Sequence, residues 1–79
     1  MTISEAMTTK IVNICAERNL SINKLANVCG ITQSTIENIV NGNSKNPKLL
    51  TVIRICDGLQ ITLQDFFSDK LFLNLDRED

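Results

Sequence analysis

The chain has 79 residues, of which 43% are apolar and 22% are charged, and it contains no histidine. This length allows one small domain, and the apolar fraction is high enough for a core, which argues against a disordered chain. No apolar run approaches the roughly 20 residues that a membrane span requires, and no basic segment followed by an apolar one marks a secretory signal. These features predict a single cytoplasmic domain without membrane contact.

The residues that most enzymes and metal sites require are missing. Cys15, Cys29 and Cys56 are widely spaced, whereas a zinc site usually needs four ligands in two close pairs. The sequence also lacks a Gly-rich phosphate loop and a pair of carboxylates at a plausible site. We therefore expect no enzymatic activity, no metal, no cofactor and no small-molecule effector. The three cysteines are expected to be buried free thiols.

The charge is unevenly distributed along the chain, although the net charge is only −1. Residues 21–56 hold four basic side chains against one acidic one, while residues 57–79 hold two basic against six acidic. Local charge matters more than net charge for a ligand that touches one face of a protein. The middle of the chain is therefore the part suited to an anionic partner.

Apolar spacing predicts helices almost throughout, and the first helix follows Thr2. Its apolar residues recur every three or four positions, at Ile3, Met7, Ile11 and Ile14. This spacing places them on one face of a helix. Thr2 and Glu5 can form a capping box at its start, and Asn19 and Leu20 close it.

A second and a third helix follow, joined by only three or four residues. Ser21 is a natural N-cap for the second helix, and Thr32 caps the third. Gly30 stands where the end of a helix favours a left-handed residue, and Ala26 is small enough to let the two helices cross closely. The apolar residues are Ile22, Leu25, Ala26 and Cys29 in the second helix and Ile36, Ile39 and Val40 in the third. This arrangement predicts a helix-turn-helix.

Two more helices are predicted beyond the Asn41-Gly42-Asn43-Ser44 loop. Asn46-Pro47 predicts the start of a fourth helix, with asparagine as the N-cap and proline as its first residue. Asp57-Gly58 predicts its end, and Thr62 with Asp65 predicts the cap of a fifth helix. The residues expected to be buried are Leu49, Val52, Ile53 and Cys56 in the fourth helix and Leu63, Phe66 and Phe67 in the fifth.

The end of the chain changes character. We divide the sequence into a domain of residues 1–69 and a tail of residues 70–79, which is first apolar and then acidic. The segment from Phe66 to Leu75 holds more apolar side chains than a small core absorbs, which predicts a homodimer contact there. The alternative is that Phe72 folds back onto the first helix. The acidic residues from Asp76 to Asp79 are expected to form a frayed end.

Six phrases of the sequence occur together in a fixed order. They are Arg18-Asn19-Leu20-Ser21, Lys24-Leu25-Ala26, Gly30-Ile31-Thr32-Gln33-Ser34-Thr35-Ile36, Asn41-Gly42, Asn46-Pro47 and Leu59-Gln60-Ile61-Thr62-Leu63. With them, the stretch from about Ile11 to Phe67 resembles the repressor/Cro-type helix-turn-helix proteins, also called the XRE family. The resemblance implies an all-α, five-helix repressor-like domain whose third helix lies in the major groove of double-stranded DNA.

The resemblance also implies the site residues. Family members touch base edges at the positions of Gln33, Ser34 and Asn38, and they usually meet the phosphate backbone at the positions of Asn41, Asn43, Lys45 and Lys48. To these we add Ser21, Thr32 and Thr35, since the start of a helix offers free amides to a phosphate. The chemistry of the side chains agrees, because glutamine and asparagine can each bond N6 and N7 of adenine.

One departure from the family pattern leaves two hypotheses open. Family members often carry a glutamine directly after the position of Ser21, where it contacts a phosphate and braces the first recognition glutamine; here the residue is Ile22. Glu37 would repel phosphate unless it accepts from a cytosine amino group or points aside.

The leading hypothesis is a sequence-specific DNA-binding transcription regulator, a repressor that acts as a homodimer. The alternative is a protein-interaction module, such as an antitoxin-like partner, on the same fold.

Overall fold

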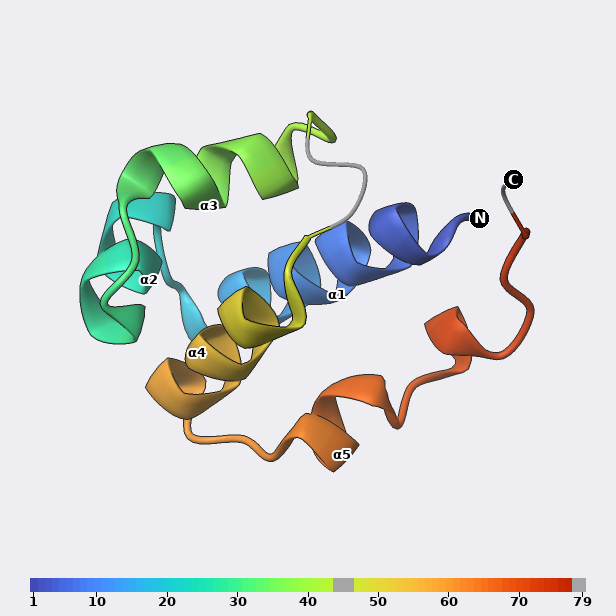
Figure 1. The fold of residues 1–79 in the computed structure, drawn as a ribbon. Helices are drawn as coiled ribbons and strands as arrows, with labels where there is room; N and C mark the ends of the chain where they lie inside the picture. Colours follow the sequence, from blue (N-terminus) through green and yellow to red (C-terminus); the bar gives the residue numbers. More distant parts are fainter. Residues whose placement is uncertain (44–46, 78–79) are drawn as a thin grey trace.

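The computed structural model describes residues 1–43 and 47–77, and this part of the chain contains five α-helices, one short 3-10 helix and no strand. The elements are α1 (Ile3–Arg18), α2 (Ile22–Cys29), α3 (Gln33–Val40), α4 (Leu49–Leu59), α5 (Leu63–Phe67) and η1 (Lys70–Phe72). Helices α1 and α4 lie between α3 on one side and α5 on the other (Figure 1). The predicted all-α, five-helix architecture is confirmed.

Helix α1 begins and ends as its sequence predicts. The Thr2 hydroxyl accepts from the Glu5 N–H at 3.2 Å, and the Glu5 carboxylate accepts from the Thr2 N–H at 2.8 Å, which completes the capping box. Asn19 ends the helix in the left-handed conformation, with φ 56°. The buried residues of α1 are Ala6, Met7, Ile11 and Ile14. Ile3 was expected among them but is 38% exposed, because it is the first residue of the helix.

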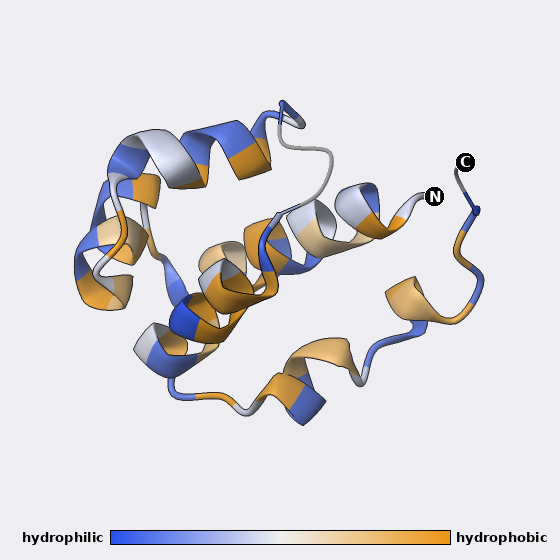
Figure 2. Ribbon diagram, viewed as in Figure 1, coloured by the Kyte–Doolittle hydropathy of each residue, from blue (hydrophilic) through white to orange (hydrophobic). Residues whose placement is uncertain are grey.

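The predicted helix-turn-helix consists of α2 and α3, which pack against each other. Ser21 caps α2 by accepting from the Lys24 N–H at 3.1 Å, and Gly30 ends α2 with φ 66°. Their inward residues are Leu25, Ala26 and Cys29 from α2 and Ile36 and Ile39 from α3. Figure 2 shows apolar and polar residues interleaved along both helices, as expected where one side of each is buried.

Helix α4 differs from the prediction at its start and in its buried face. It begins at Leu49, with Lys48 as the N-cap, so Pro47 precedes the helix; Asn46, the predicted cap, lies outside the described residues. The φ angle of proline suits both an extended residue and a first helical residue, so the Asn-Pro signal alone does not fix the start. The buried residues are Val52, Ile55, Cys56 and Leu59.

This buried set differs from the expected one because α4 packs against both α2 and α5. The expected and observed faces share Val52 and Cys56 and are rotated by about 60° relative to each other at 100° per residue. The rotation brings Ile55 inside, with none of its surface exposed, and leaves Leu49 58% exposed. Ile53 lies at the margin, half-buried.

The predicted end of α4 at Asp57-Gly58 was wrong, because Gly58 has a packing role. A Cβ at Gly58 would lie 2.5 Å from Cys29 Sγ, 2.8 Å from Cys29 Cα and 2.9 Å from the Val28 carbonyl oxygen. The helix continues to Leu59 and ends at Gln60, which takes the left-handed conformation with φ 59°. The glycine thus allows α2 and α4 to approach closely.

The apolar part of the tail folds back onto the domain. Phe66 is fully buried, and the rings of Phe67 and Phe72 pack edge to face, with centroids 4.9 Å apart. Helix η1 contacts α1, where the Lys10 ammonium pairs with the Asp69 carboxylate at 3.0 Å. Phe72 packs against the core, and η1, which contains it, contacts α1, in agreement with the alternative that Phe72 folds back onto the first helix. Leu73 remains 75% exposed.

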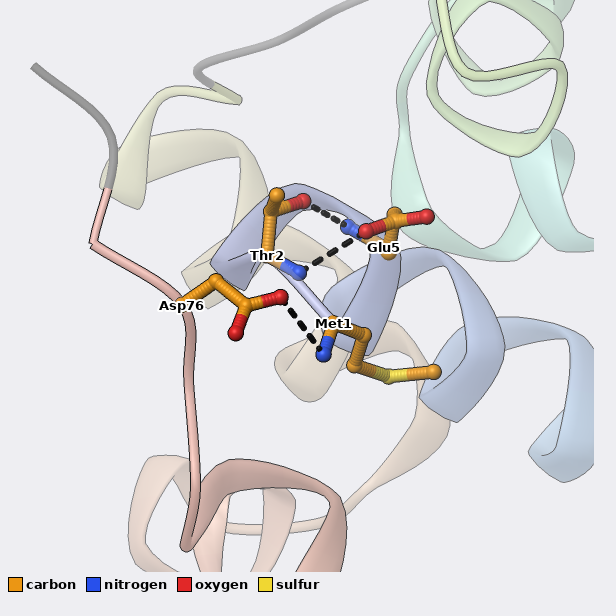
Figure 3. Close-up of polar contacts among 4 residues, drawn as sticks. All are labelled: Met1, Thr2, Glu5 and Asp76. Atoms are coloured by element: carbon orange, nitrogen blue, oxygen red, sulfur yellow. Dashed lines mark hydrogen bonds and ion pairs between the residues drawn. The ribbon is translucent and has the colours of Figure 1, made fainter.

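The chain returns to its beginning at Asp76. The Asp76 N–H donates to the Met1 carbonyl oxygen at 3.0 Å. The Asp76 carboxylate pairs with the Met1 ammonium at 3.1 Å, next to the Thr2–Glu5 capping box (Figure 3). The expectation that the acidic end frays from Asp76 onward was wrong for this residue. The negative charge of Asp76 is held by the positive charge of the Met1 ammonium, just before α1.

The three cysteines are free thiols, and two are buried as expected. Cys15 is only half-buried, which corrects the expectation for this residue. Burial raises the pKa of all three thiols, and that of Cys29 reaches about 11 because the nearby Cys15 and Cys56 thiols add to the effect. No helix in the described part of the chain is long and apolar enough to cross a membrane. Within residues 1–43 and 47–77, no three metal-binding side chains are grouped to hold an ion.

Candidate nucleic-acid interface

Helix α3 separates its residues cleanly between an inner and an outer side. Ile36 and Ile39 are buried against the core, and Val40 is half-buried. The exposed residues are Gln33, Ser34, Glu37, Asn38 and the C-cap Asn41. At 100° per residue these five fall within an arc of about 140°. The three predicted base-reading residues, Gln33, Ser34 and Asn38, therefore share one outward, polar side of a single helix.

The first turn of α3 is fixed by two threonines. The Thr32 hydroxyl accepts from the Thr35 N–H at 3.2 Å and lies 2.8 Å from the Thr35 hydroxyl. One of the two hydroxyl hydrogens is used between these oxygens, so the pair retains one hydrogen that can be donated to a phosphate. Thr32 is exposed and Thr35 is half-buried.

The N-termini of α2, α3 and α4 are the positive ends of the helix dipoles, and no acidic residue lies in the first turn of any of the three. Such a terminus attracts an anion through its free N–H groups. Ser21, before α2, is exposed, and its cap bond uses an oxygen lone pair while the hydroxyl hydrogen stays available. Lys48, the exposed N-cap of α4, makes no side-chain cap bond.

The segment after α3 is held to the helix by its backbone. The Asn41 N–H donates to the Glu37 carbonyl oxygen at 2.8 Å, and the Asn43 N–H donates to the Asn38 carbonyl oxygen at 2.9 Å. Gly42 between them has φ 76°, which a residue with a side chain rarely adopts. Both asparagine side chains are exposed. Lys45, the remaining predicted phosphate contact, lies outside the described residues.

One contact on the outer side of α3 was not predicted. The side-chain Nε2 of Gln33 donates to the Glu37 carboxylate at 2.9 Å. Glu37 therefore points aside toward Gln33, which is one of the arrangements that the sequence left open. The spacing of four residues was the available signal, because side chains at i and i+4 are neighbours on a helix.

A comparison with protein-family models identifies the family of this chain. The family model of the Cro/C1-type HTH DNA-binding domain matches residues 10–70, which include α2, α3, α4 and α5 and most of α1. The chain belongs to the Cro/C1-type helix-turn-helix family. The comparisons with curated proteins and with solved structures found no match.

Membership of the Cro/C1-type family gives the helix pair its role. A domain of this family binds DNA, so the chain is a DNA-binding regulatory protein.

Proposed function

We propose that this Cro/C1-type protein is a sequence-specific transcription regulator that places α3 in the major groove of DNA and acts as a repressor. The observation that supports this most is the polar outer side of α3, opposite the buried Ile36 and Ile39. An α-helix fits the major groove, where each base pair presents a distinct pattern of donors and acceptors. A domain that occupies a promoter represses by excluding other proteins, and it needs no further activity to do so.

Three residues of α3 read bases in this proposal. Gln33, at the first helical position, presents an amide that matches N6 and N7 of adenine, and Asn38 offers the same chemistry further along the helix. Ser34 is short, so it lets the helix backbone approach the bases and can itself donate or accept. All three are exposed.

In the proposal, the phosphate contacts come from the starts of α2, α3 and α4 and from the segment that follows α3 in the sequence. They are Ser21, Thr32, Thr35, Asn41, Asn43, Lys45 and Lys48. The hydroxyl and amide groups among them fix the position of the helix on the duplex, whereas the two lysines supply charge. Release of counterions from the DNA makes the lysine contribution dependent on salt.

The proposal includes a homodimer. One helix-turn-helix contacts few base pairs, and two of them related by a two-fold axis read half-sites about 34–36 Å apart. Most of the apolar segment predicted to form this contact is packed within the chain, and Leu73 is its most exposed large side chain, at 75%. The selected DNA sites test the dimer, because a two-fold dimer selects an inverted repeat and a monomer selects a single half-site.

The test begins by selecting bound sites from a random DNA pool at a stated salt concentration. Gln33→Ala should then cost about 1–3 kcal/mol at the selected site and leave binding to a scrambled duplex nearly unchanged. Lys48→Ala should weaken binding to both duplexes and reduce the slope of log affinity against log salt by about one unit. Gln64→Ala, the same truncation on the exposed surface of α5, is the matched control.

The outcome separates the two hypotheses for this protein. Loss of discrimination in Gln33→Ala supports reading by α3. If Gln33→Ala weakens both duplexes equally, or neither, α3 does not read sequence, and the protein-interaction module becomes the better explanation.

A further inference from the structure

The contact between Gln33 and Glu37 has a fixed polarity. An ionised carboxylate can only accept a hydrogen bond, so the amide nitrogen of Gln33, and not its oxygen, must face Glu37. The 2.9 Å distance from Nε2 to the carboxylate oxygen agrees with this assignment. The amide group of Gln33 therefore has a defined orientation before any DNA is bound.

This orientation determines which groups Gln33 has left to offer. One of the two Nε2 hydrogens is used by Glu37, and the other remains together with both lone pairs of Oε1. When Glu37 holds the Nε2 hydrogen that points away from Oε1, the free side of the amide presents one acceptor next to one donor. Both residues are exposed on the outer side of α3, so this side is accessible to a ligand.

One acceptor beside one donor is complementary to adenine and not to guanine. In the major groove adenine presents the N6 amino group as a donor and N7 as an acceptor, whereas guanine presents two acceptors, O6 and N7. Guanine would need two donors from Gln33, and one of the two hydrogens is already bound to Glu37. The oxygen of the oriented amide would also face a guanine acceptor, which is unfavourable.

We propose that Glu37 is a positioning residue that orients the side-chain amide of Gln33 and thereby makes Gln33 select adenine over guanine. The proposal rests on the proposed function, in which α3 reads the major groove. The positioning residue lies on the same helix as the reading residue, four positions further on.

The charge of Glu37 gives the proposal a distinctive signature. A carboxylate on the DNA-facing side repels phosphates and lowers the affinity for every sequence. Glu37→Gln removes this repulsion and also lets either end of the Gln33 amide face outward. The variant should therefore bind DNA more tightly overall while discriminating less between adenine and guanine.

The experiment measures competition between two duplexes that differ only at the base pair where Gln33→Ala loses discrimination. We expect the unsubstituted protein to prefer adenine there by about 5- to 150-fold, the range for a bidentate contact. Glu37→Gln should lower this ratio by about two- to tenfold, between the value of an exposed i,i+4 helix pair and that of a hydrogen bond to a charged group. In the Gln33→Ala background, Glu37→Gln should leave the ratio unchanged.

Asp65→Asn is the matched control for charge. It removes one negative charge from the exposed surface of α5, on the opposite side of the molecule from α3 (Figure 1). This variant should keep the adenine-to-guanine ratio of the unsubstituted protein. An unchanged ratio in Glu37→Gln would show that Glu37 acts only as a repelling charge and would overturn the proposal. Absence of any preference in the unsubstituted protein would instead overturn base reading by α3, and this proposal with it.

A second measurement needs no DNA. In the free protein, the side-chain amide signals of Gln33 in an 15N–1H NMR spectrum should shift in Glu37→Gln, with one of the two hydrogens moving more than the other. The signals of Gln64 on α5 serve as the internal reference. If the Gln33 signals do not move, the amide is not held by Glu37 in solution and the proposal is wrong.

Discussion

Replacing Gly58 by alanine tests whether α2 and α4 are as close as the structure shows. The added Cβ would lie 2.5 Å from Cys29 Sγ and 2.8 Å from Cys29 Cα, whereas non-bonded carbon atoms prefer about 3.5–4.0 Å. The helices would have to separate by about 1 Å, and two of the three neighbouring atoms are backbone atoms that cannot rotate away. Overpacking of this kind costs about 1–3 kcal/mol, with a backbone clash toward the upper end.

Helix propensity acts in the opposite direction at Gly58. Alanine is favoured over glycine within a helix by about 1 kcal/mol. With a clash of about 3 kcal/mol, we expect Gly58→Ala to lower the free energy of unfolding by about 2 kcal/mol. For a domain of this size, that corresponds to a fall in Tm of about 8–16 °C.

Urea unfolding followed by circular dichroism at 222 nm measures this loss. Asp57→Ala, at the exposed neighbouring position of α4, is the control and should change stability little. In a double-mutant cycle with Cys29→Ala, part of the loss should be recovered, because the nearest clashing atom is removed while the backbone atoms stay. A Gly58→Ala protein as stable as the unsubstituted one, or more stable, would refute the close approach of the two helices.

Three further predictions concern other parts of the chain. Gln60→Gly should raise the free energy of unfolding by about 1 kcal/mol in the same urea assay, because Gln60 has φ 59° and glycine adopts this conformation without a side-chain penalty. The Leu71 N–H and the Lys10 ammonium hold the pKa of Asp69 below its usual value, so in acid the folded state binds fewer protons than the unfolded state. As the pH is lowered below about 5, Tm should therefore fall more steeply in the unsubstituted protein than in Asp69→Asn. Equal slopes would contradict this. At pH 8, a thiol reagent mapped by mass spectrometry should modify Cys15 before Cys29 and Cys56, since Cys15 is the most exposed and burial raises the pKa of Cys29 to about 11; rapid modification of Cys29 in the folded protein would contradict its burial.

The sequence predicted those features of the fold that depend on neighbouring residues. The caps at Thr2, Ser21, Thr32 and Thr62 are confirmed, because a hydroxyl three residues before a free N–H is a local signal. The end of α4 could not be predicted in this way. In the sequence, Gly58 looks like a helix terminator. In the structure, a glycine is needed there because Cys29, which belongs to another helix, lies too close for a side chain. The left-handed Gln60 carries no sequence signal, since glutamine is not a preferred residue there.

The candidate site was predictable to a similar extent. Once α3 begins at Gln33, periodicity alone places Gln33, Ser34 and Asn38 on the side opposite Ile36 and Ile39. The direction of the Glu37 side chain was not predictable, because a solvated carboxylate and one bonded to Gln33 have the same sequence. The placement of Phe72 likewise depended on packing, since the same apolar residues could have met a second chain or their own core.

The bonds between Met1 and Asp76 also bear on the order of folding. Residues 1 and 76 enclose almost the whole described chain, and closing a loop of this length in an unfolded chain costs about 4 kcal/mol. The exposed ion pair and the backbone hydrogen bond together return only about 1–2 kcal/mol. We therefore expect them to form after Phe72 and the Lys10–Asp69 pair have brought the tail to α1. In hydrogen exchange, the Asp76 amide should report the opening of this last-formed contact, while the amides within α2, α3 and α4 report cooperative unfolding of the domain.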